Sequence, residues 1–155
     1  MRLLLIVVLL SFMSPLSNYT YEYPKQTENQ LTKTIERDID CLAKNIYHES
    51  RGEPTKGQYA VAHVTMNRVS QYGLSVCRVV YQPSQFSWTI GKTPAVYDKV
   101  AFDKAKEIAW DVYRGDTHDF TGGATYYHAK YVKPNWSRKF KKTLALGSHI
   151  FYKVA

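Results

Sequence analysis

Apolar residues recur along the first half of the chain with the three- and four-residue spacing of an amphipathic helix. The positions that follow steps of four, four, three and four are Leu31, Ile35, Ile39, Leu42 and Ile46. This stripe predicts a first helix over about residues 31–51. Similar reasoning predicts a second helix over about 55–69, a short helical turn over 75–81, and a third long helix over about 96–114.

The last part of the chain contains two short runs that favour β-structure. Residues 124–128 form the first run, and we expect it to pair with residues 148–152. Residues 82–84 indicate a turn, and the aromatic segment 85–90 is either extended or looped. The pattern therefore predicts an α+β fold, with a mainly helical body that carries a small β-hairpin or sheet near the C-terminus.

Glu49 occupies a position in the first helix where the apolar stripe would continue. One step of three from Ile46 reaches this carboxylate, and Gly52 and Pro54 then favour the end of the helix. Burial disfavours the charged form of a carboxyl group and so raises its pKa. A proton that is still held near neutral pH is what a general acid needs. The alternative is that the stripe ends one turn earlier and that Glu49 is solvated.

The N-terminus predicts export. Met1-Arg2 is followed by an uninterrupted apolar run over residues 3–10, which is typical of a signal peptide and short for a membrane span. We assign residues 1–17 to a signal peptide or an uncleaved N-terminal anchor, and residues 18–30 to a polar tether. Residues 31–155 then form one domain, which is secreted or periplasmic.

Two cysteines, Cys41 and Cys77, are the only ones in the chain. An even number suits an oxidising compartment, and a disulfide between them would join the first helix to the segment after the second. Two buried free thiols are the alternative.

The chain has a formal net charge of +8 and a pI of about 9.4. This charge suits a polyanionic partner such as nucleic acid, an anionic membrane, or an envelope with peptide carboxylates and phosphates. Export argues against nucleic acid. The basic residues look scattered, apart from Arg138-Lys139 and Lys141-Lys142. Aromatic residues make up 14% of the chain, and planar rings are typical of clefts that bind sugars.

No metal or cofactor is predicted. His48-Glu49 resembles the start of the zinc motif His-Glu-x-x-His, but the second histidine would fall at Gly52. The other histidines lack the local spacing of metal ligands. No Gly-x-Ser-x-Gly elbow is present to supply a serine nucleophile.

Several blocks in family order resemble the cell wall hydrolase family of SleB/CwlJ type, over about residues 41–152. They are residues 46–54 (IYHESRGEP), 57–58, 60–62, 67–69, 80–82, 85–88, 122–128, Trp136 and 147–152. The resemblance implies a lysozyme-like fold with a cleft between a helical lobe and a β-containing lobe. It implies that Glu49 is the catalytic acid and that 31–155 is a catalytic domain.

The resemblance also implies a substrate, the glycan strand of peptidoglycan, cleaved between N-acetylmuramic acid and N-acetylglucosamine. We expect a monomer that works on an anionic cell envelope, without nucleic acid, and touches the membrane transiently through its N-terminal segment. Candidate substrate-binding residues are Gln85, Ser87, Thr125, Tyr127, His128 and Trp136, with Trp136 either a stacking platform or a lobe anchor. Candidate second carboxylates are Glu53, Asp116 and Asp119, and the alternative for the two aspartates is that they only form turns. Glu53 has an alternative role at the start of the second helix.

Two mechanisms fit these residues. A lytic transglycosylase needs one carboxylate, whereas a lysozyme-type muramidase needs two. The resemblance favours the transglycosylase. A zinc amidase or peptidase and a non-catalytic envelope-binding module are alternatives from other classes. The sequence does not distinguish a phage endolysin from a bacterial enzyme that remodels the wall.

Overall fold

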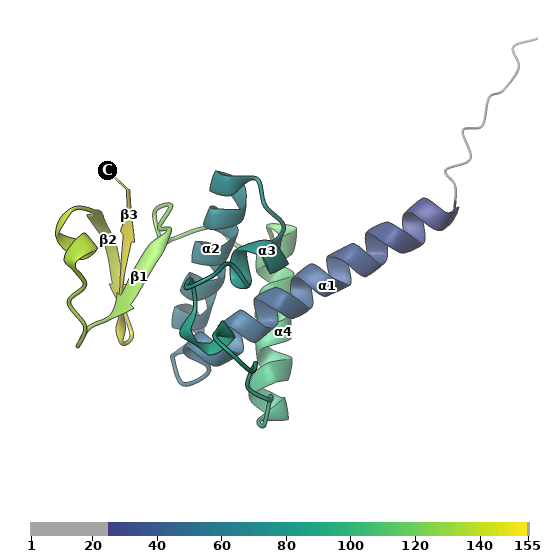
Figure 1. Ribbon diagram of the computed structural model, residues 1–155, viewed down its shortest axis with the longest axis horizontal. Helices are drawn as coiled ribbons and strands as arrows, with labels where there is room; N and C mark the ends of the chain where they lie inside the picture. Colours follow the sequence, from purple (N-terminus) through teal and green to yellow (C-terminus); the bar gives the residue numbers. More distant parts are fainter. Residues whose placement is uncertain (1–24, 155) are drawn as a thin grey trace, which may run out of the picture.

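A computed structural model describes residues 25–154 and shows a helical body with a small antiparallel sheet on one side (Figure 1). The elements, in chain order, are α1 (Lys25–Ser50), α2 (Thr55–Tyr72), α3 (Val76–Val80), η1 (Ser87–Thr89), α4 (Lys99–Arg114), β1 (Tyr126–Ala129), η2 (Asn135–Arg138), β2 (Lys141–Leu146) and β3 (His149–Lys153). The α+β class is therefore confirmed. The signal peptide or anchor assigned to residues 1–17 lies outside the described residues, as does the first part of the tether.

Helix α1 begins at Lys25, earlier than the predicted start near residue 31. Residues 27–34 are exposed, so no apolar stripe is needed there and the periodicity gave no sign of the extra turns. Leu31, the first residue of the predicted stripe, is 61% exposed, whereas Leu42 and Ile46 are fully buried. The stripe therefore marks the part of α1 that packs on other elements, and not the whole helix.

The ends of the other helices follow local signals. Gly73 ends α2 and Gly115 ends α4, both with the positive φ that favours glycine (63° and 77°). The carboxylate of Asp98 accepts a 2.9 Å hydrogen bond from the backbone N–H of Ala101 and so begins α4. This start is slightly later than the predicted one near residue 96.

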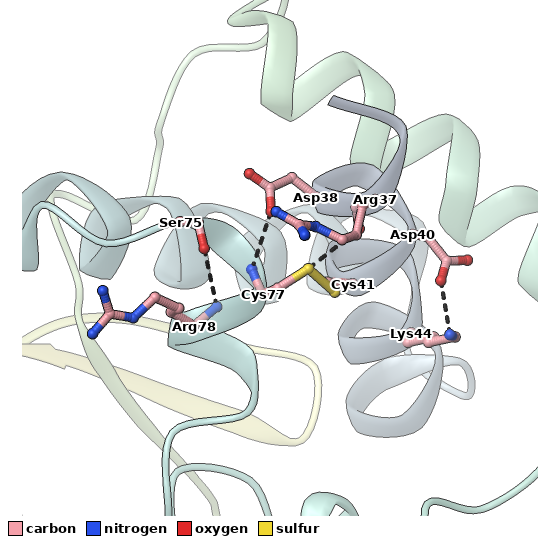
Figure 2. Close-up of a disulfide and its surroundings, with 8 residues drawn as sticks. All are labelled: Arg37, Asp38, Asp40, Cys41, Lys44, Ser75, Cys77 and Arg78. Carbon is pink, nitrogen blue, oxygen red and sulfur yellow. Dashed lines mark hydrogen bonds and ion pairs between the residues drawn. A yellow bond between two sulfur atoms is a disulfide. The ribbon is translucent and has the colours of Figure 1, made fainter. Parts of the chain in front are cut away.

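The main core lies around the C-terminal half of α1, which packs against α2, α3 and α4. Its fully or almost fully buried side chains include Leu42, Ile46, Ala62, Val80, Ile108 and Ala109. The predicted disulfide between Cys41 and Cys77 is present and joins α1 to α3 (Figure 2). Beside it, the carboxylate of Asp38 accepts a hydrogen bond of 3.4 Å from the backbone N–H of Cys77.

The sheet has the strand order β1-β3-β2, with both pairs antiparallel. The predicted pairing of the two β-prone runs is confirmed, since Tyr127 lies opposite Phe151. Strand β2 was missed because it begins with two lysines and contains a register shift between Lys142 and Leu144. Phe151 packs with Ala60 and other apolar residues of α2, which fastens the sheet to the helical body.

No helix among residues 25–154 combines the length and the apolar character needed to cross a membrane.

Candidate active site

Glu49 lies in the last turn of α1, where the helix reaches a cleft beside the sheet. One turn earlier Ile46 is fully buried, and its carbonyl accepts a 2.8 Å hydrogen bond from the hydroxyl of Ser50. The helix ends at Ser50, so Glu49 is half-buried between the core and solvent. The placement inferred from the apolar stripe is therefore observed.

The cleft consists of two hollows of about 440 Å³ each. The residues that line both are His48, Glu49, Ala129, Tyr131 and His149. Because they share these walls, we treat them as two halves of one cleft with Glu49 at the junction. A larger hollow of about 700 Å³ lies beside the disulfide, and no carboxylate lines it.

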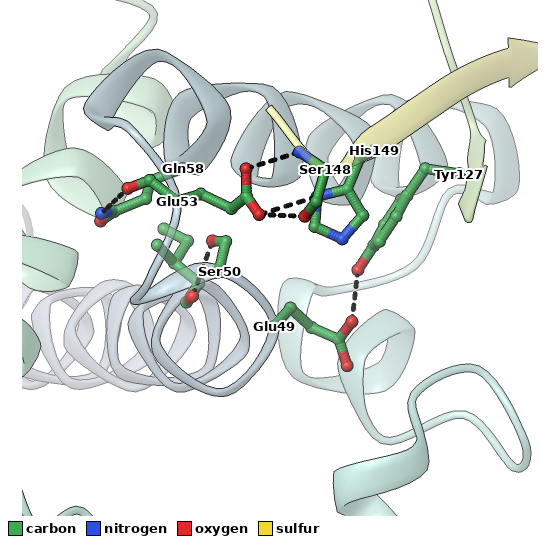
Figure 3. A network of polar contacts seen from close by, with 8 residues as sticks. Glu49, Ser50, Glu53, Gln58, Tyr127, Ser148 and His149 are labelled. Atoms are coloured by element: carbon green, nitrogen blue, oxygen red, sulfur yellow. Dashed lines mark hydrogen bonds and ion pairs between the residues drawn. The ribbon is translucent and has the colours of Figure 1, made fainter. Parts of the chain in front are cut away.

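Tyr127 reaches Glu49 from strand β1. Its hydroxyl donates a hydrogen bond of 2.8 Å to Oε2 of Glu49 (Figure 3). Burial raises the pKa of Glu49 above its usual value, while the hydrogen bond from Tyr127 and the charge of Arg68 oppose the rise. Burial is the largest of these effects, so Glu49 holds its proton to higher pH than an exposed glutamate.

Arg68 of α2 is buried beneath the same part of the cleft, with 5% of its surface exposed. Its Nε donates a 2.7 Å hydrogen bond to the carbonyl of Thr125, and its guanidinium lies 5.2 Å from the centre of the Phe86 ring. Burial lowers the pKa of Arg68. The arginine brings a positive charge close to Glu49 without forming an ion pair with it among the described contacts.

Glu53 connects the end of α1 to the turn between β2 and β3. Its carboxylate accepts hydrogen bonds from the backbone N–H of Ser148, at 3.0 Å, and from the Ser148 hydroxyl (Figure 3). Burial tends to raise the pKa of Glu53, but the two bonds from Ser148 outweigh it and the pKa is lowered. The capping hydrogen bonds considered for Glu53 are absent, because its carboxylate accepts from Ser148 and makes no cap bond at α2.

His48 lies on the rim of the cleft. Its ring stacks on Trp88 with centroids 4.5 Å apart, and burial lowers its pKa. Trp88 is fixed in turn, because its indole N–H donates a 3.1 Å hydrogen bond to Oδ1 of Asn45. The rim therefore presents a neutral, planar surface next to the acid.

Four of the six candidate binding residues line the cleft with Glu49: Gln85, Ser87, Tyr127 and His128. Thr125 does not line the cleft. It is buried, and its backbone N–H donates a hydrogen bond to the carbonyl of Tyr152. Trp136 lines neither half of the cleft. Its ring packs against Tyr126, 5.4 Å away, as expected if it anchors the sheet lobe.

Asp116 and Asp119 also lie away from the cleft. Asp116 forms a 3.3 Å ion pair with Arg114 at the end of α4. Asp119 accepts hydrogen bonds from Thr121 and from the side-chain amide of Asn67, and these bonds lower its pKa although burial alone would raise it. Neither residue therefore supplies a second carboxylate to the cleft: Asp116 pairs at the end of α4, and Asp119 holds the turn before β1, as expected of a turn former.

Sequence reasoning did not identify Arg68, Tyr131 or His149 as parts of the site. Arg68 gave a signal, because it is a charged residue on the buried face of α2. Tyr131 and His149 gave none, since their positions depend on how the loop after β1 and the turn before β3 fold back onto α1. Among residues 25–154, no group of three or more histidines, cysteines, aspartates or glutamates is arranged to hold a metal ion.

A helical body, a small sheet and a cleft with one partly buried glutamate define a lysozyme-like domain. Residues 52–152 match the family model described as Cell Wall Hydrolase, and the chain belongs to this family. The matched range begins three residues after Glu49.

Curated relatives include the spore cortex-lytic enzyme of Oceanobacillus iheyensis, which is 33% identical over 125 residues, 76% of this chain and 42% of the relative. The spore cortex-lytic enzyme of Bacillus cereus is 35% identical over 131 residues, 76% of this chain and 45% of the relative. The chain therefore spans less than half the length of these relatives.

Two solved structures share the fold. One is the catalytic domain of the Bacillus cereus SleB protein, with a TM-score of 0.64 and 33% identity over 76% of this chain and 91% of that one. The other is the catalytic domain of the germination-specific lytic transglycosylase SleB from Bacillus anthracis, with a TM-score of 0.60 and 34% identity over 75% and 93%. The predicted lysozyme-like fold is confirmed.

Proposed function

We propose that this protein is an exported enzyme that degrades peptidoglycan by cleaving its glycan strand between N-acetylmuramic acid and N-acetylglucosamine. The observation that carries the proposal is the partly buried Glu49, which lies where the two halves of the cleft meet. A sugar chain lying along such a cleft would place one glycosidic bond beside the acid. The relatives named spore cortex-lytic enzyme, and the neighbour named lytic transglycosylase, support the same substrate.

The mechanism that these residues favour is that of a lytic transglycosylase. Glu49 gives its proton to the glycosidic oxygen, and the bond between this oxygen and C1 of the muramic acid breaks. The resulting carboxylate then accepts the proton of the C6 hydroxyl of the same sugar, whose oxygen bonds to C1. The product ends in a 1,6-anhydro ring, and Glu49 is protonated again. The nucleophile belongs to the substrate, so the reaction gains from proximity and requires no water.

The lysozyme-type alternative needs a second carboxylate to attack C1 or to activate water. Among the described residues that line the cleft, the other acid is Glu53, and Ser148 already donates two hydrogen bonds to it. This engagement favours a structural role for Glu53. Asp116 and Asp119 lie outside the cleft.

The test is to digest purified peptidoglycan in labelled water and to read the products by mass spectrometry. We expect 1,6-anhydro-muramic ends that contain no label, and no products from Glu49→Gln. Reducing muramic ends that carry labelled oxygen would overturn the transglycosylase mechanism and favour a muramidase. Released stem peptides, with a loss of activity on adding a chelator, would indicate an amidase or peptidase instead.

Export is proposed on two features. Residues 1–17 have the composition of a signal peptide or anchor, and the Cys41–Cys77 disulfide suits an oxidising compartment. Fractionation of cells that produce the full chain should recover it outside the cytoplasm, and recovery in the cytoplasm alone would contradict the proposal.

A further inference from the structure

The positive charge of this protein is concentrated in the sheet lobe, which we define as residues 124–154. The lobe contains seven of the 21 lysines and arginines and none of the 13 acidic residues. It supplies +7 of the formal net charge of +8, so the rest of the chain is close to neutral. The basic residues themselves are spread along the chain, with 14 of the 21 outside the lobe, and the lobe differs because it contains no acidic residue. The seven are Lys130, Lys133, Arg138, Lys139, Lys141, Lys142 and Lys153.

These charges are available to a partner. All of them are exposed except Lys153, which is half-buried. Among the described residues none of the seven forms an ion pair with a carboxylate, whereas Lys44, Lys99 and Arg114 of the helical body each pair with an aspartate. Within the described part of the chain, the basic residues of the sheet lobe are therefore not neutralised by paired carboxylates, whereas several of those in the helical body are.

Lys141 and Lys153 lie directly opposite each other in the antiparallel pair of β2 and β3. Like charges at directly opposed positions destabilise a sheet. Folding alone gives no reason for this pairing, but an anionic group that binds near both ammonium groups would offset the repulsion. This cross-strand pair points to an anionic ligand, separately from the net charge.

Two of the seven basic residues are adjacent in the sequence to residues that line the cleft. Lys130 lies between Ala129 and Tyr131, which line both halves of the cleft, and its charge contributes to the lowered pKa of Glu53. Lys133 follows Val132, which lines the half that contains Tyr127. A polymer held in the cleft would therefore pass close to Lys130 and Lys133, at the edge of the basic surface of the sheet lobe.

We propose that the sheet lobe binds free carboxylates on the peptide stems of peptidoglycan while the glycan strand lies in the cleft. The proposal rests on the proposed function, because it takes the polymer in the cleft as given. Six of the seven basic residues are lysines. A lysine ammonium group is a point charge on a flexible chain, whereas the planar guanidinium of arginine binds a carboxylate in a fixed bidentate geometry. Lysines therefore suit carboxylates at irregular positions along flexible stems.

The test measures binding, without turnover, in the Glu49→Gln protein. One variant adds Lys141→Gln, Lys142→Gln and Lys153→Gln. Its matched control adds Lys33→Gln, Lys92→Gln and Lys106→Gln, three exposed lysines of the helical body, and so has the same net charge. Cosedimentation with purified peptidoglycan is measured over a range of salt concentrations. We expect the sheet-lobe variant to bind roughly tenfold more weakly than the control at low salt, with a difference that shrinks as salt rises.

Chemical changes to the wall identify the anion. Converting the stem carboxylates to neutral amides should abolish the difference between variant and control, whereas removing phosphate-containing polymers should leave it in place. Equal binding of variant and control to untreated wall would overturn the proposal. So would a difference that survives amidation and disappears with the phosphate polymers.

Two further measurements keep the outcome interpretable. The melting temperature of the sheet-lobe variant should be no lower than that of the control, because the substitutions relieve the repulsion between Lys141 and Lys153. Glycan cleavage by the unmodified enzyme is measured separately. If the unmodified enzyme does not cleave glycan, the proposed function is refuted, but the two variants can still be compared for binding to the wall.

Discussion

The hydroxyl of Tyr127 donates a 2.8 Å hydrogen bond to Oε2 of Glu49, although 78 residues separate them in the sequence. This contact joins the sheet lobe to the end of α1 at the candidate catalytic acid. A hydrogen bond to the charged form of a carboxyl group favours ionisation, whereas burial favours the protonated form. The state of Glu49 therefore depends on how closely the two lobes are held together.

Tyr127→Phe should raise the pKa of Glu49 further, because it removes a donor that stabilises the carboxylate. The phenyl ring can keep its packing against Phe151. We expect the basic limb of the kcat/KM profile to move to higher pH, since this limb reports ionisation of the acid in the free enzyme. We also expect the free energy of unfolding to fall by about 1 kcal/mol. An unchanged basic limb would show that Tyr127 does not tune Glu49.

Glu49→Gln and Glu53→Gln should change stability with opposite dependence on pH. The folded-state pKa of Glu49 is raised, so its favourable contribution is present below the usual glutamate value of 4.5 and is lost as pH rises through the folded pKa. Glu49→Gln should therefore be more stable than the unmodified protein at neutral pH, and equally stable at pH 3–4. Its lytic activity should fall below detection, because the variant lacks the proton donor.

The folded-state pKa of Glu53 is lowered, so its contribution is present above 4.5 and is lost as pH falls through the folded pKa. Glu53→Gln should be less stable at neutral pH, by about 1–2 kcal/mol for the weakened bonds with Ser148. Thermal unfolding of the three proteins from pH 3 to 8 measures both effects. Parallel curves for the two variants would contradict the assignments.

The parts of this structure that were predictable from the sequence depend on local spacing. The stripe that ends at Ile46 identified Glu49, because this signal lies within one turn of its effect. Strand β2 was missed because its apolar residues on the core side, Leu144 and Leu146, are too few to reveal an alternating pattern.

The missed residues of the site depend on tertiary contacts. His149 enters the cleft because Glu53 binds the adjacent Ser148, and the sequence offers no local mark of a contact between positions 95 residues apart. Asp119 was only a candidate second carboxylate, because its sequence context did not show where its side chain would be held. The side-chain amide of Asn67 and the backbone of Thr121 hold its carboxylate in the turn.

Removing the disulfide should destabilise the protein. Cys41 and Cys77 are 36 residues apart, and closing such a loop contributes roughly 3–4 kcal/mol in the chain-entropy model. We expect Cys41→Ser with Cys77→Ser to lower the free energy of unfolding by about this amount, measured by denaturant titration. The unmodified protein from an oxidising compartment should show no free thiols when it is labelled in denaturant without reductant. Labelling of both cysteines would contradict the observed bond.

Gly147→Ala should disturb the connection between Glu53 and Ser148. Gly147 has φ of 55°, and a Cβ at this position would overlap Oε2 of Glu53. We expect a loss of about 1–3 kcal/mol in the free energy of unfolding. Gly91→Ala is the matched control, because Gly91 also has positive φ but no atom within 4 Å of the added Cβ. Equal losses for the two variants would show that the Glu53 contact adds nothing to the cost of backbone strain.

Two substitutions of Arg68 can separate the effect of its charge on Glu49 from the effect of its packing. Arg68→Lys keeps a positive charge, whereas Arg68→Met removes it. Both lose the 2.7 Å hydrogen bond from Nε to the carbonyl of Thr125, and both lose the planar contact with Phe86. Each should therefore lower the free energy of unfolding by about 1.5–3 kcal/mol, the range for hydrogen bonds of charged groups.

The pH profile distinguishes the two variants. The charge of Arg68 lowers the pKa of Glu49, so its removal in Arg68→Met should raise this pKa and move the basic limb of kcat/KM to higher pH. Arg68→Lys should leave the limb close to that of the unmodified enzyme, even though it is destabilised as well. If both variants shift the limb equally, the effect on Glu49 arises from the loss of packing beneath the cleft. If neither shifts it, Arg68 supports the cleft without influencing the acid.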